Sequence, residues 1–310
     1  MSKNILLDYF FNVEAITPTS QASTAFLKQA CIVVNSNSGG TDGDITQCST
    51  IAEIEAVTDN EDAKELLAGG MSKIYVLQND DLDLQSILDA FGPEFFTLII
   101  SSDFNDTNIT GMDLGLFKGV VGVSSATESF LEAQAVIPKR VSFFTKTENG
   151  AKNMCYAFGK LLSSFTWRNQ QYVTMPYDDE VETLGKAESY FDDKISFVLN
   201  DKEFGKRLGL FAVGGKAIVA PYILKNLEID MQSRALSYIS GNQPQYTIKE
   251  ATLIEDELSQ VIEGFVDRGL ITIGTVSIAV DQGNFIASGQ INVSEPTGLW
   301  RFKAELKQTL

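Results

Sequence analysis

The chain has 310 residues with 24 Lys+Arg against 41 Asp+Glu, a formal net charge of −17 at pH 7, and 44% hydrophobic residues. This composition excludes wholesale disorder, and the length is sufficient for two domains. The sequence contains no histidine, which excludes Ser-His-Asp and Cys-His catalysis as well as histidine-ligated zinc and haem.

The acidic charge is concentrated in the first half of the chain. Residues 1–150 carry 8 basic and 21 acidic residues, whereas residues 151–310 carry 16 and 20. Phosphate groups of nucleic acids and anionic lipids bind clustered Lys and Arg. No run approaches 18 apolar residues, and the N-terminus lacks the apolar core of a signal peptide. We therefore expect no nucleic-acid partner, no membrane insertion, and folding in a reducing cytoplasm.

The first predicted element is a strand near the N-terminus. Its residues alternate so that one face is wholly apolar, and two further apolar residues lie on the opposite face. The first face consists of Ile5, Leu7, Tyr9, Phe11 and Val13. An apolar strand at a chain end must pair with a sheet edge, either in its own chain or in another copy.

Residues 20–165 alternate between strand-like and helix-like segments. Helical spacing of apolar residues is found around 51–57, 63–67 and 84–91. Short apolar runs, typical of strands covered on both faces, occupy 31–34, 74–77, 97–100, 119–123 and 141–144. This alternation predicts an α/β domain with a largely parallel sheet. Cys31 lies in the first run, where a buried thiol is expected, and three cysteines without ligand spacing predict no disulfide framework.

The chain is predicted to turn helical from about 150 to 240. One helix covers 151–162, and a second begins near Pro221 and ends at Gly241. The glycine-containing segment Val213–Ala217 is interpreted as a loop that leads into the second helix. A third helix is predicted over 249–268, because its apolar residues recur at helical spacing before a glycine.

Period-2 alternation returns in the last forty residues. Residues 276–280 and 285–293 flank the turn Asp281–Asn284 and predict a β-hairpin. A final strand at Leu299–Lys307 has one charged face, and its apolar face includes Trp300, Phe302 and Leu306.

The predicted fold class is α/β, with an α/β domain followed by an α+β C-terminal domain and extended β arms at both chain ends. The expected boundaries are 1–19 for the N-terminal arm, 20–165 for the α/β domain, 166–295 for the C-terminal domain and 296–310 for the C-terminal arm. Neither glycine-rich loop, at 38–44 or 213–217, completes a phosphate-binding motif. The acidic clusters lack calcium-loop register. We expect no catalytic residue, no cofactor and no metal ligand.

The order of elements resembles that of contractile-tail sheath proteins of bacteriophages. The step Leu66–Leu77, in which a helix, Gly-Gly and a strand follow one another, is similar to a step of that family, and Leu82–Ser102 is similar to its next helix and strand. The helix Ala220–Ser240 resembles a helix of the sheath C-terminal domain. The closing hairpin and the Leu299–Leu306 strand resemble its terminal β elements.

The resemblance implies a non-enzymatic virion structural protein without cofactors. Copies of such a subunit form stacked hexameric rings around a tail tube, joined by exchanged terminal arms, and contraction drives the tube through the host envelope for genome ejection. The implied partners are other copies, the tube protein, and baseplate and tail terminator proteins. The implied location is the virion tail, assembled in the host cytoplasm.

Contacts with the tube should be polar, because the sheath must release the tube on contraction. The candidates are a basic set, Lys202, Lys206 and Arg207, and an acidic set, Glu255, Glu263 and Asp267. Two alternatives remain open: a cytoplasmic α/β enzyme or nucleotide-binding protein, and another tail or baseplate structural protein.

Overall fold

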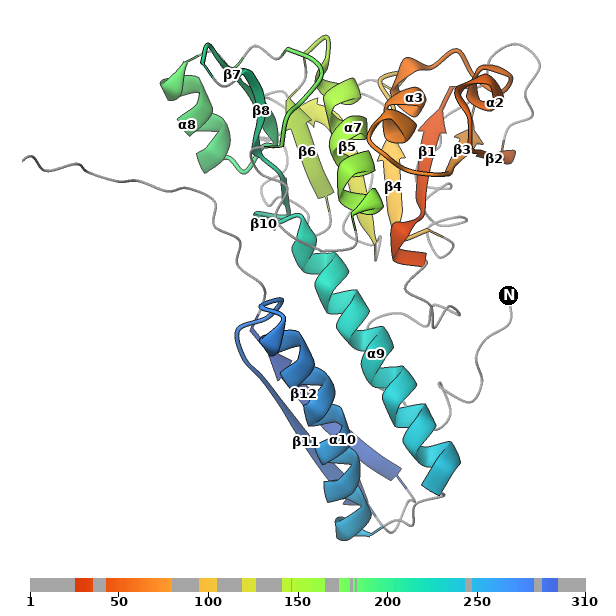
Figure 1. Ribbon diagram of the computed structural model, residues 1–310, viewed down its shortest axis with the longest axis vertical. Helices are drawn as coiled ribbons and strands as arrows, with labels where there is room; N and C mark the ends of the chain where they lie inside the picture. The colour runs from red at the N-terminus through yellow and green to blue at the C-terminus, as the bar shows by residue number, and fades with distance from the viewer. Residues whose placement is uncertain are drawn as a thin grey trace, which may run out of the picture.

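The computed structural model describes residues 26–35, 43–79, 95–104, 119–126, 141–145, 147–164, 173–178, 181, 183–203, 205–242, 247–281 and 286–294. Figure 1 shows an α/β body joined by one long helix to a unit that consists of a further helix and a β-hairpin. The elements of the body up to α7 are η1 (Phe26–Lys28), β1 (Ala30–Val34), β2 (Ile45–Cys48), α2 (Ile51–Glu55), α3 (Glu61–Ala68), β3 (Ile74–Gln78), β4 (Thr97–Ile100), β5 (Val120–Ala126), β6 (Val141–Thr145) and α7 (Gly150–Ser163). The remaining elements are α8 (Leu184–Asp192), β7 (Phe197–Asp201), β8 (Gly205–Leu210), β9 (Ala212–Val213), β10 (Lys216–Ala217), α9 (Val219–Asn242), α10 (Ile248–Asp267), β11 (Gly274–Asp281) and β12 (Ile286–Val293).

The central sheet has the strand order β2-β3-β1-β4-β5-β6. The pairs among β3, β1, β4, β5 and β6 are parallel, which confirms the five predicted strands and the α/β class. The edge strand β2, which the sequence did not indicate, pairs antiparallel with β3. Its residues Ile-Thr-Gln-Cys are for the most part only partly buried, so the sequence has no continuous apolar run that would predict this strand.

Both faces of this sheet are covered. Alternate residues of β1 belong to different clusters: Ile32 and Val34 pack in the large core with α3, α7 and α9, whereas Cys31 and Val33 pack in a second cluster on the opposite face. All five residues of β1 are buried, including the predicted buried thiol of Cys31. Strands of this kind read as unbroken apolar runs, which is why the pattern predicted them correctly.

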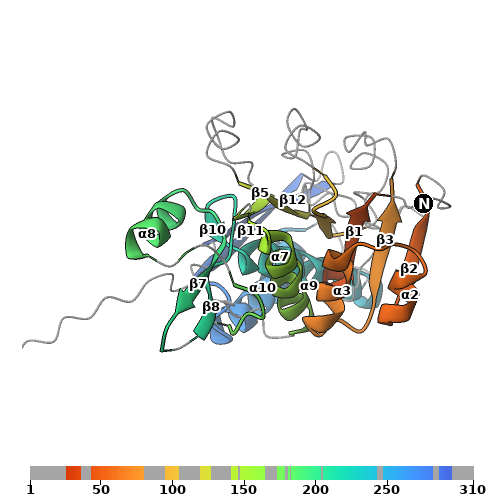
Figure 2. The same cartoon turned by 90° about the horizontal axis from the view of Figure 1, so that it is seen from above.

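Helices α3 and α7 cross at a pair of glycines. A Cβ built on Gly159 of α7 would lie 2.5 Å from the carbonyl oxygen of Leu66 and 2.8 Å from Cα of Gly69. The two backbones therefore touch without intervening side chains. This close approach seats both helices against the same face of the sheet (Figure 2).

The prediction that residues 150–240 are largely helical is wrong for 197–217. Strands β7 and β8 form an antiparallel hairpin there, and β9 and β10 form a second one across Gly214-Gly215, both of which have positive φ. The β7–β8 hairpin is a separate two-stranded sheet, and Ser196, which directly precedes β7, forms a parallel bridge with Phe144 of β6. The segment expected to be a loop before Pro221 is thus a tight β-turn.

The helix α9 begins inside the core and leaves it. All five residues from Val219 to Ile223 are buried, and the Tyr222 hydroxyl lies 2.8 Å from the Thr97 hydroxyl at the start of β4. The Tyr222 ring also contacts Phe96 edge-on. Beyond Ala235 no residue of α9 is fully buried, and α10 is the described helix that packs against it there.

The unit at the far end of α9 consists of α10 and the predicted hairpin. Thr247 caps α10 by accepting a hydrogen bond from Glu250 N, and Gly269, at φ 68°, ends it with a bond from Leu270 N to Phe265 O. Strands β11 and β12 pair antiparallel over eight residues each and pack on α10. The third helix and the hairpin are therefore confirmed. The domain boundaries at 19, 165 and 295 stay predictions.

Candidate interaction surface

The two predicted arms, with Ile5, Leu7, Tyr9, Phe11, Val13, Trp300, Phe302 and Leu306, lie outside the described residues. The surface on which arms of this kind could act is described: it is the β11–β12 hairpin, which forms a sheet of its own with two strands. A two-stranded hairpin is marginally stable by itself in water and depends on packing against a neighbour. Here α10 provides that support on one face.

The inner face of the hairpin is incompletely covered. Val276, Ile278, Ile291 and Val293 pack against the core with α10, yet all four are only half-buried. The outer face, with Thr275, Ser277, Ala279 and Asn292, is exposed. The hairpin is thus apolar toward α10 and polar outward. Among the described residues no third strand widens it.

The hydrogen-bond register identifies which backbone groups point outward. Ser294 N donates to Ile273 O over 2.9 Å, so these two residues form a bonded pair. Bonded and non-bonded pairs alternate in an antiparallel ladder. The printed register then makes Val276·Ile291 and Ile278·Gly289 non-bonded pairs, whose N–H and C=O groups point away from the partner strand. These groups form the two outer edges of the hairpin.

The acidic candidates for the tube contact have separate surroundings. Glu263 and Asp267 are exposed on α10, four residues apart and therefore on one face of the helix. Glu255 is half-buried, and its Oε2 accepts a hydrogen bond from Ile278 N of β11 over 3.0 Å. The structure brings Glu255 to the hairpin rather than to the outer face of α10.

The basic candidates lie on the β7–β8 hairpin, far from α10 in Figure 1. Lys206 Nζ lies 3.0 Å from Asp178 Oδ1 and donates to Pro176 O over 3.1 Å, and Arg207 donates to the Thr174 hydroxyl. Both cations therefore hold the segment 173–178 against β8. Lys202 is exposed in the turn of the hairpin.

Helices α9 and α10 are tied together by charged and polar contacts. Arg234 of α9 forms an ion pair of 2.5 Å with Glu257 of α10, and the Tyr238 hydroxyl lies 3.2 Å from Glu250 Oε2. A shallow groove runs between the two helices and is lined in part by Asp230, Gly264 and Arg268. Burial raises the pKa of the Asp230 carboxyl, and nearby Arg268 opposes that shift.

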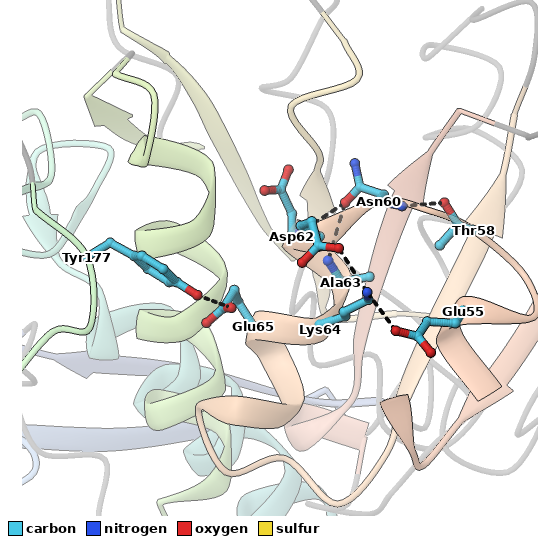
Figure 3. Close-up of polar contacts among 9 residues, drawn as sticks. Glu55, Thr58, Asn60, Asp62, Ala63, Lys64, Glu65 and Tyr177 are labelled. Atoms are coloured by element: carbon cyan, nitrogen blue, oxygen red, sulfur yellow. Dashed lines mark hydrogen bonds and ion pairs between the residues drawn. The ribbon is translucent and has the colours of Figure 1, made fainter. Parts of the chain in front are cut away.

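Two buried carboxylates lie in the body, near the N-terminus of α3 (Figure 3). Asp62 accepts hydrogen bonds from Ser102 N and Oγ over 2.7 and 2.6 Å. Glu65 accepts one from the Tyr177 hydroxyl over 2.5 Å, as Figure 3 shows. Burial raises the pKa of both carboxyls, and the bond to Glu65 raises the pKa of Tyr177 to about 12. Each carboxylate fastens a different loop to α3, which is a structural use of a buried acid.

No cluster of three or more potential metal ligands occurs within the described ranges. None of the helices described there combines the length and the apolar character needed to cross a bilayer. Sequence reasoning did not find the Glu255, Asp62 or Glu65 contacts, since each joins side chains to groups 23 or more residues away.

No family model and no curated protein matches this sequence. Several solved structures, in contrast, match the fold over most of the chain. A chain of the anti-feeding prophage (AFP) baseplate has a TM-score of 0.69 at 11% identity, and the match covers 95% of this chain and 96% of that one. A chain of the contracted PVC sheath complex, from an extracellular contractile injection system, has a TM-score of 0.66 at 10% identity, covering 94% of both chains. The sheath tail protein from Desulfitobacterium hafniense has a TM-score of 0.55 at 8% identity, covering 86% of this chain and 96% of that one. The resemblance to sheath proteins is confirmed at the level of the fold.

Proposed function

We propose that this chain, which has the fold of contractile sheath proteins, is a non-enzymatic sheath subunit that polymerises as stacked rings around a tube and shortens to drive it forward. The observation that carries the proposal is the extent of the likeness, which covers 94% or more of both chains in the two comparisons with the highest TM-scores quoted above. A likeness of this extent includes both the α/β body and the hairpin unit.

Subunits join by strand addition in this proposal. The hairpin has two outer edges, and its apolar inner face is only half-buried. Strands added at the edges from the chain ends of neighbouring copies would extend the ladder and cover that face. Backbone hydrogen bonds of this kind persist while subunits rotate, provided that short linkers such as Thr17-Pro18 and Pro296-Thr297-Gly298 bend.

For the tube contact we favour the acidic set reduced to Glu263 and Asp267. Both are exposed on one face of α10, whereas Glu255 is engaged with β11 and two of the three basic candidates hold the segment 173–178. Exposed carboxylates fit a tube surface that carries Lys or Arg, and such contacts are strong enough to assemble yet separable on contraction.

A second position in the same machine is a ring at the baseplate end. The observation that favours it is the match to a chain of the AFP baseplate, which has the highest TM-score of the three comparisons described. In this second position the same subunit fold would form a closed ring rather than a long stack.

The test is assembly of the purified full-length chain and of variants that lack residues 1–14 or 299–310. We expect cylinders or long stacks in electron micrographs and large particles in light scattering for the full chain. Each truncated variant should remain folded by circular dichroism but stay small. Single closed rings from the full chain would favour the baseplate position. Truncated variants that still build full cylinders would refute joining by the arms.

A further inference from the structure

The outer edge of β11 is partly occupied by a side chain of the same subunit. Ile278 belongs to a non-bonded pair, so its N–H points away from β12, in the direction from which a further strand would arrive. Glu255 Oε2 accepts that N–H over 3.0 Å. A hydrogen bond between a carboxylate and a backbone N–H is stronger than the amide–carbonyl bond that an added strand would offer.

The edge of β12 differs from that of β11. Ile291 and Val293 are in non-bonded pairs with Val276 and Gly274, so their N–H groups also point outward. No side chain of the described residues bonds to either of these N–H groups. Within the described residues the hairpin therefore has one edge without a partner, that of β12, and one edge that Glu255 occupies.

We propose that Glu255 is a latch on the edge of β11 that prevents strand addition there in the free subunit, so that β12 receives its strand first. The inference rests on the strand addition proposed above. When a strand does arrive at β11, the Glu255 carboxylate must leave Ile278 N and turn to solvent. The latch thus sets an order of assembly and protects the β11 edge from random edge-to-edge pairing.

The occupant of the open β12 edge is the segment Leu299–Lys307 of a second copy. Its sequence has one apolar and one charged face, which matches the hairpin, whose inner side chains cover α10 and whose outer side chains are exposed. The segment Ile5–Val13 has apolar residues on both faces. It fits a site that is covered on both sides and is therefore a poorer match to this sheet.

The test compares the wild-type chain with Glu255→Ala and Glu255→Gln. Asp256→Ala is the control, because Asp256 is an exposed neighbour on the same helix and its loss removes the same charge. Polymer growth is followed by light scattering without tube protein, and the products are inspected by electron microscopy. Hydrogen exchange of the Ile278 amide is measured in each variant at concentrations below assembly.

For Glu255→Ala we expect the Ile278 amide to exchange at least tenfold faster, the lag before growth to shorten several-fold, and irregular aggregates to appear beside ordered polymers. Glu255→Gln retains an uncharged acceptor and should lie between Glu255→Ala and the wild type, whereas Asp256→Ala should match the wild type.

The latch is refuted if the wild type assembles and both Glu255 variants keep its lag and products, or if they assemble more slowly. If the wild type does not assemble at all, the proposed function fails, and the latch fails with it. If Glu255→Ala is unfolded, Glu255→Gln decides by the same two readouts.

Discussion

The body and the hairpin unit differ in how completely their side chains are buried and how their polar groups are paired. All five residues of β1 are buried between two clusters, whereas the described residues 275–279 of β11 alternate between exposed and half-buried. The buried acids of the body each fasten a loop of the same chain. As far as residues 274–281 and 286–293 and their described surroundings go, the hairpin has unpaired backbone groups on the β12 edge and the Glu255 side chain on the β11 edge. The difference is one of burial and backbone pairing: the strands of the body are covered on both faces, whereas those of the hairpin are covered on one.

The largest effect is expected from truncation in the body. Phe158 is fully buried and packs edge-on against Phe211, with ring centroids 5.0 Å apart. Phe158→Ala should lower the free energy of unfolding by about 3–5 kcal/mol, because it leaves a cavity in a core that cannot collapse freely. The loss is measured by denaturant unfolding of the subunit without its chain-end arms, so that polymer growth does not interfere. A loss below about 1 kcal/mol would remove the contrast between body and hairpin.

The corresponding truncation in the hairpin should cost much less. Val276 is half-buried in the free subunit, so Val276→Ala should lower the free energy of unfolding by about 1 kcal/mol or less. In the full chain the same variant should raise the concentration needed for polymer growth, since an added strand would bury this side chain. Equal effects on subunit and polymer would mean that the hairpin face is already complete.

A smaller effect, with a definite sign, is expected from pH. Burial holds the folded-state pKa of Asp62 above its ordinary value of about 4. The folded protein therefore binds this proton more tightly than the unfolded chain, and the resulting stability is present below the ordinary pKa and lost as pH rises through the raised one. Asp62→Asn carries no such proton, so its Tm should rise relative to the wild type between pH 4 and pH 7. Asp59→Asn, at an exposed neighbour, is the control, and parallel curves for both variants would contradict the prediction.

The smallest effect on stability should come from the exposed carboxylates of α10. Reversing Glu263 and Asp267 to Lys should change the free energy of unfolding by no more than about 0.5 kcal/mol per site, because both are exposed on the surface. Co-sedimentation with the tube protein should nevertheless be lost, and the wild-type association should weaken with added salt. Lys202→Glu, on the β7–β8 hairpin, should retain the tube. If Lys202→Glu lost the tube and the Lys variants of Glu263 and Asp267 retained it, the basic set would be the tube contact instead.

The sequence predicts those parts of the fold whose burial requires a regular spacing or an unbroken run of apolar residues. The body strands are covered on both faces and form unbroken apolar runs, and α10 has its apolar residues at helical spacing before Gly269. β2 and the β7–β8 hairpin were missed because partly exposed strands mix polar with apolar residues, as in Ile-Thr-Gln-Cys. The Glu255 contact could not be predicted, because its partner is the backbone N–H of Ile278, whose direction depends on the strand register. The chain-end strands stay predictions.

The continuity of α9 has a mechanical consequence. The helix has 24 residues, and its sequence contains neither Gly nor Pro between Tyr222 and Ser240, so nothing in it favours a kink. One end is fixed in the body by Tyr222, and the other is fixed to α10 by Arg234 and Tyr238. At 1.5 Å per residue α9 is a lever of about 36 Å, and a tilt of the body by about 10° would displace its far end by about 6 Å. A small rotation of the body would therefore displace the hairpin unit by more than the spacing between two strands of a sheet.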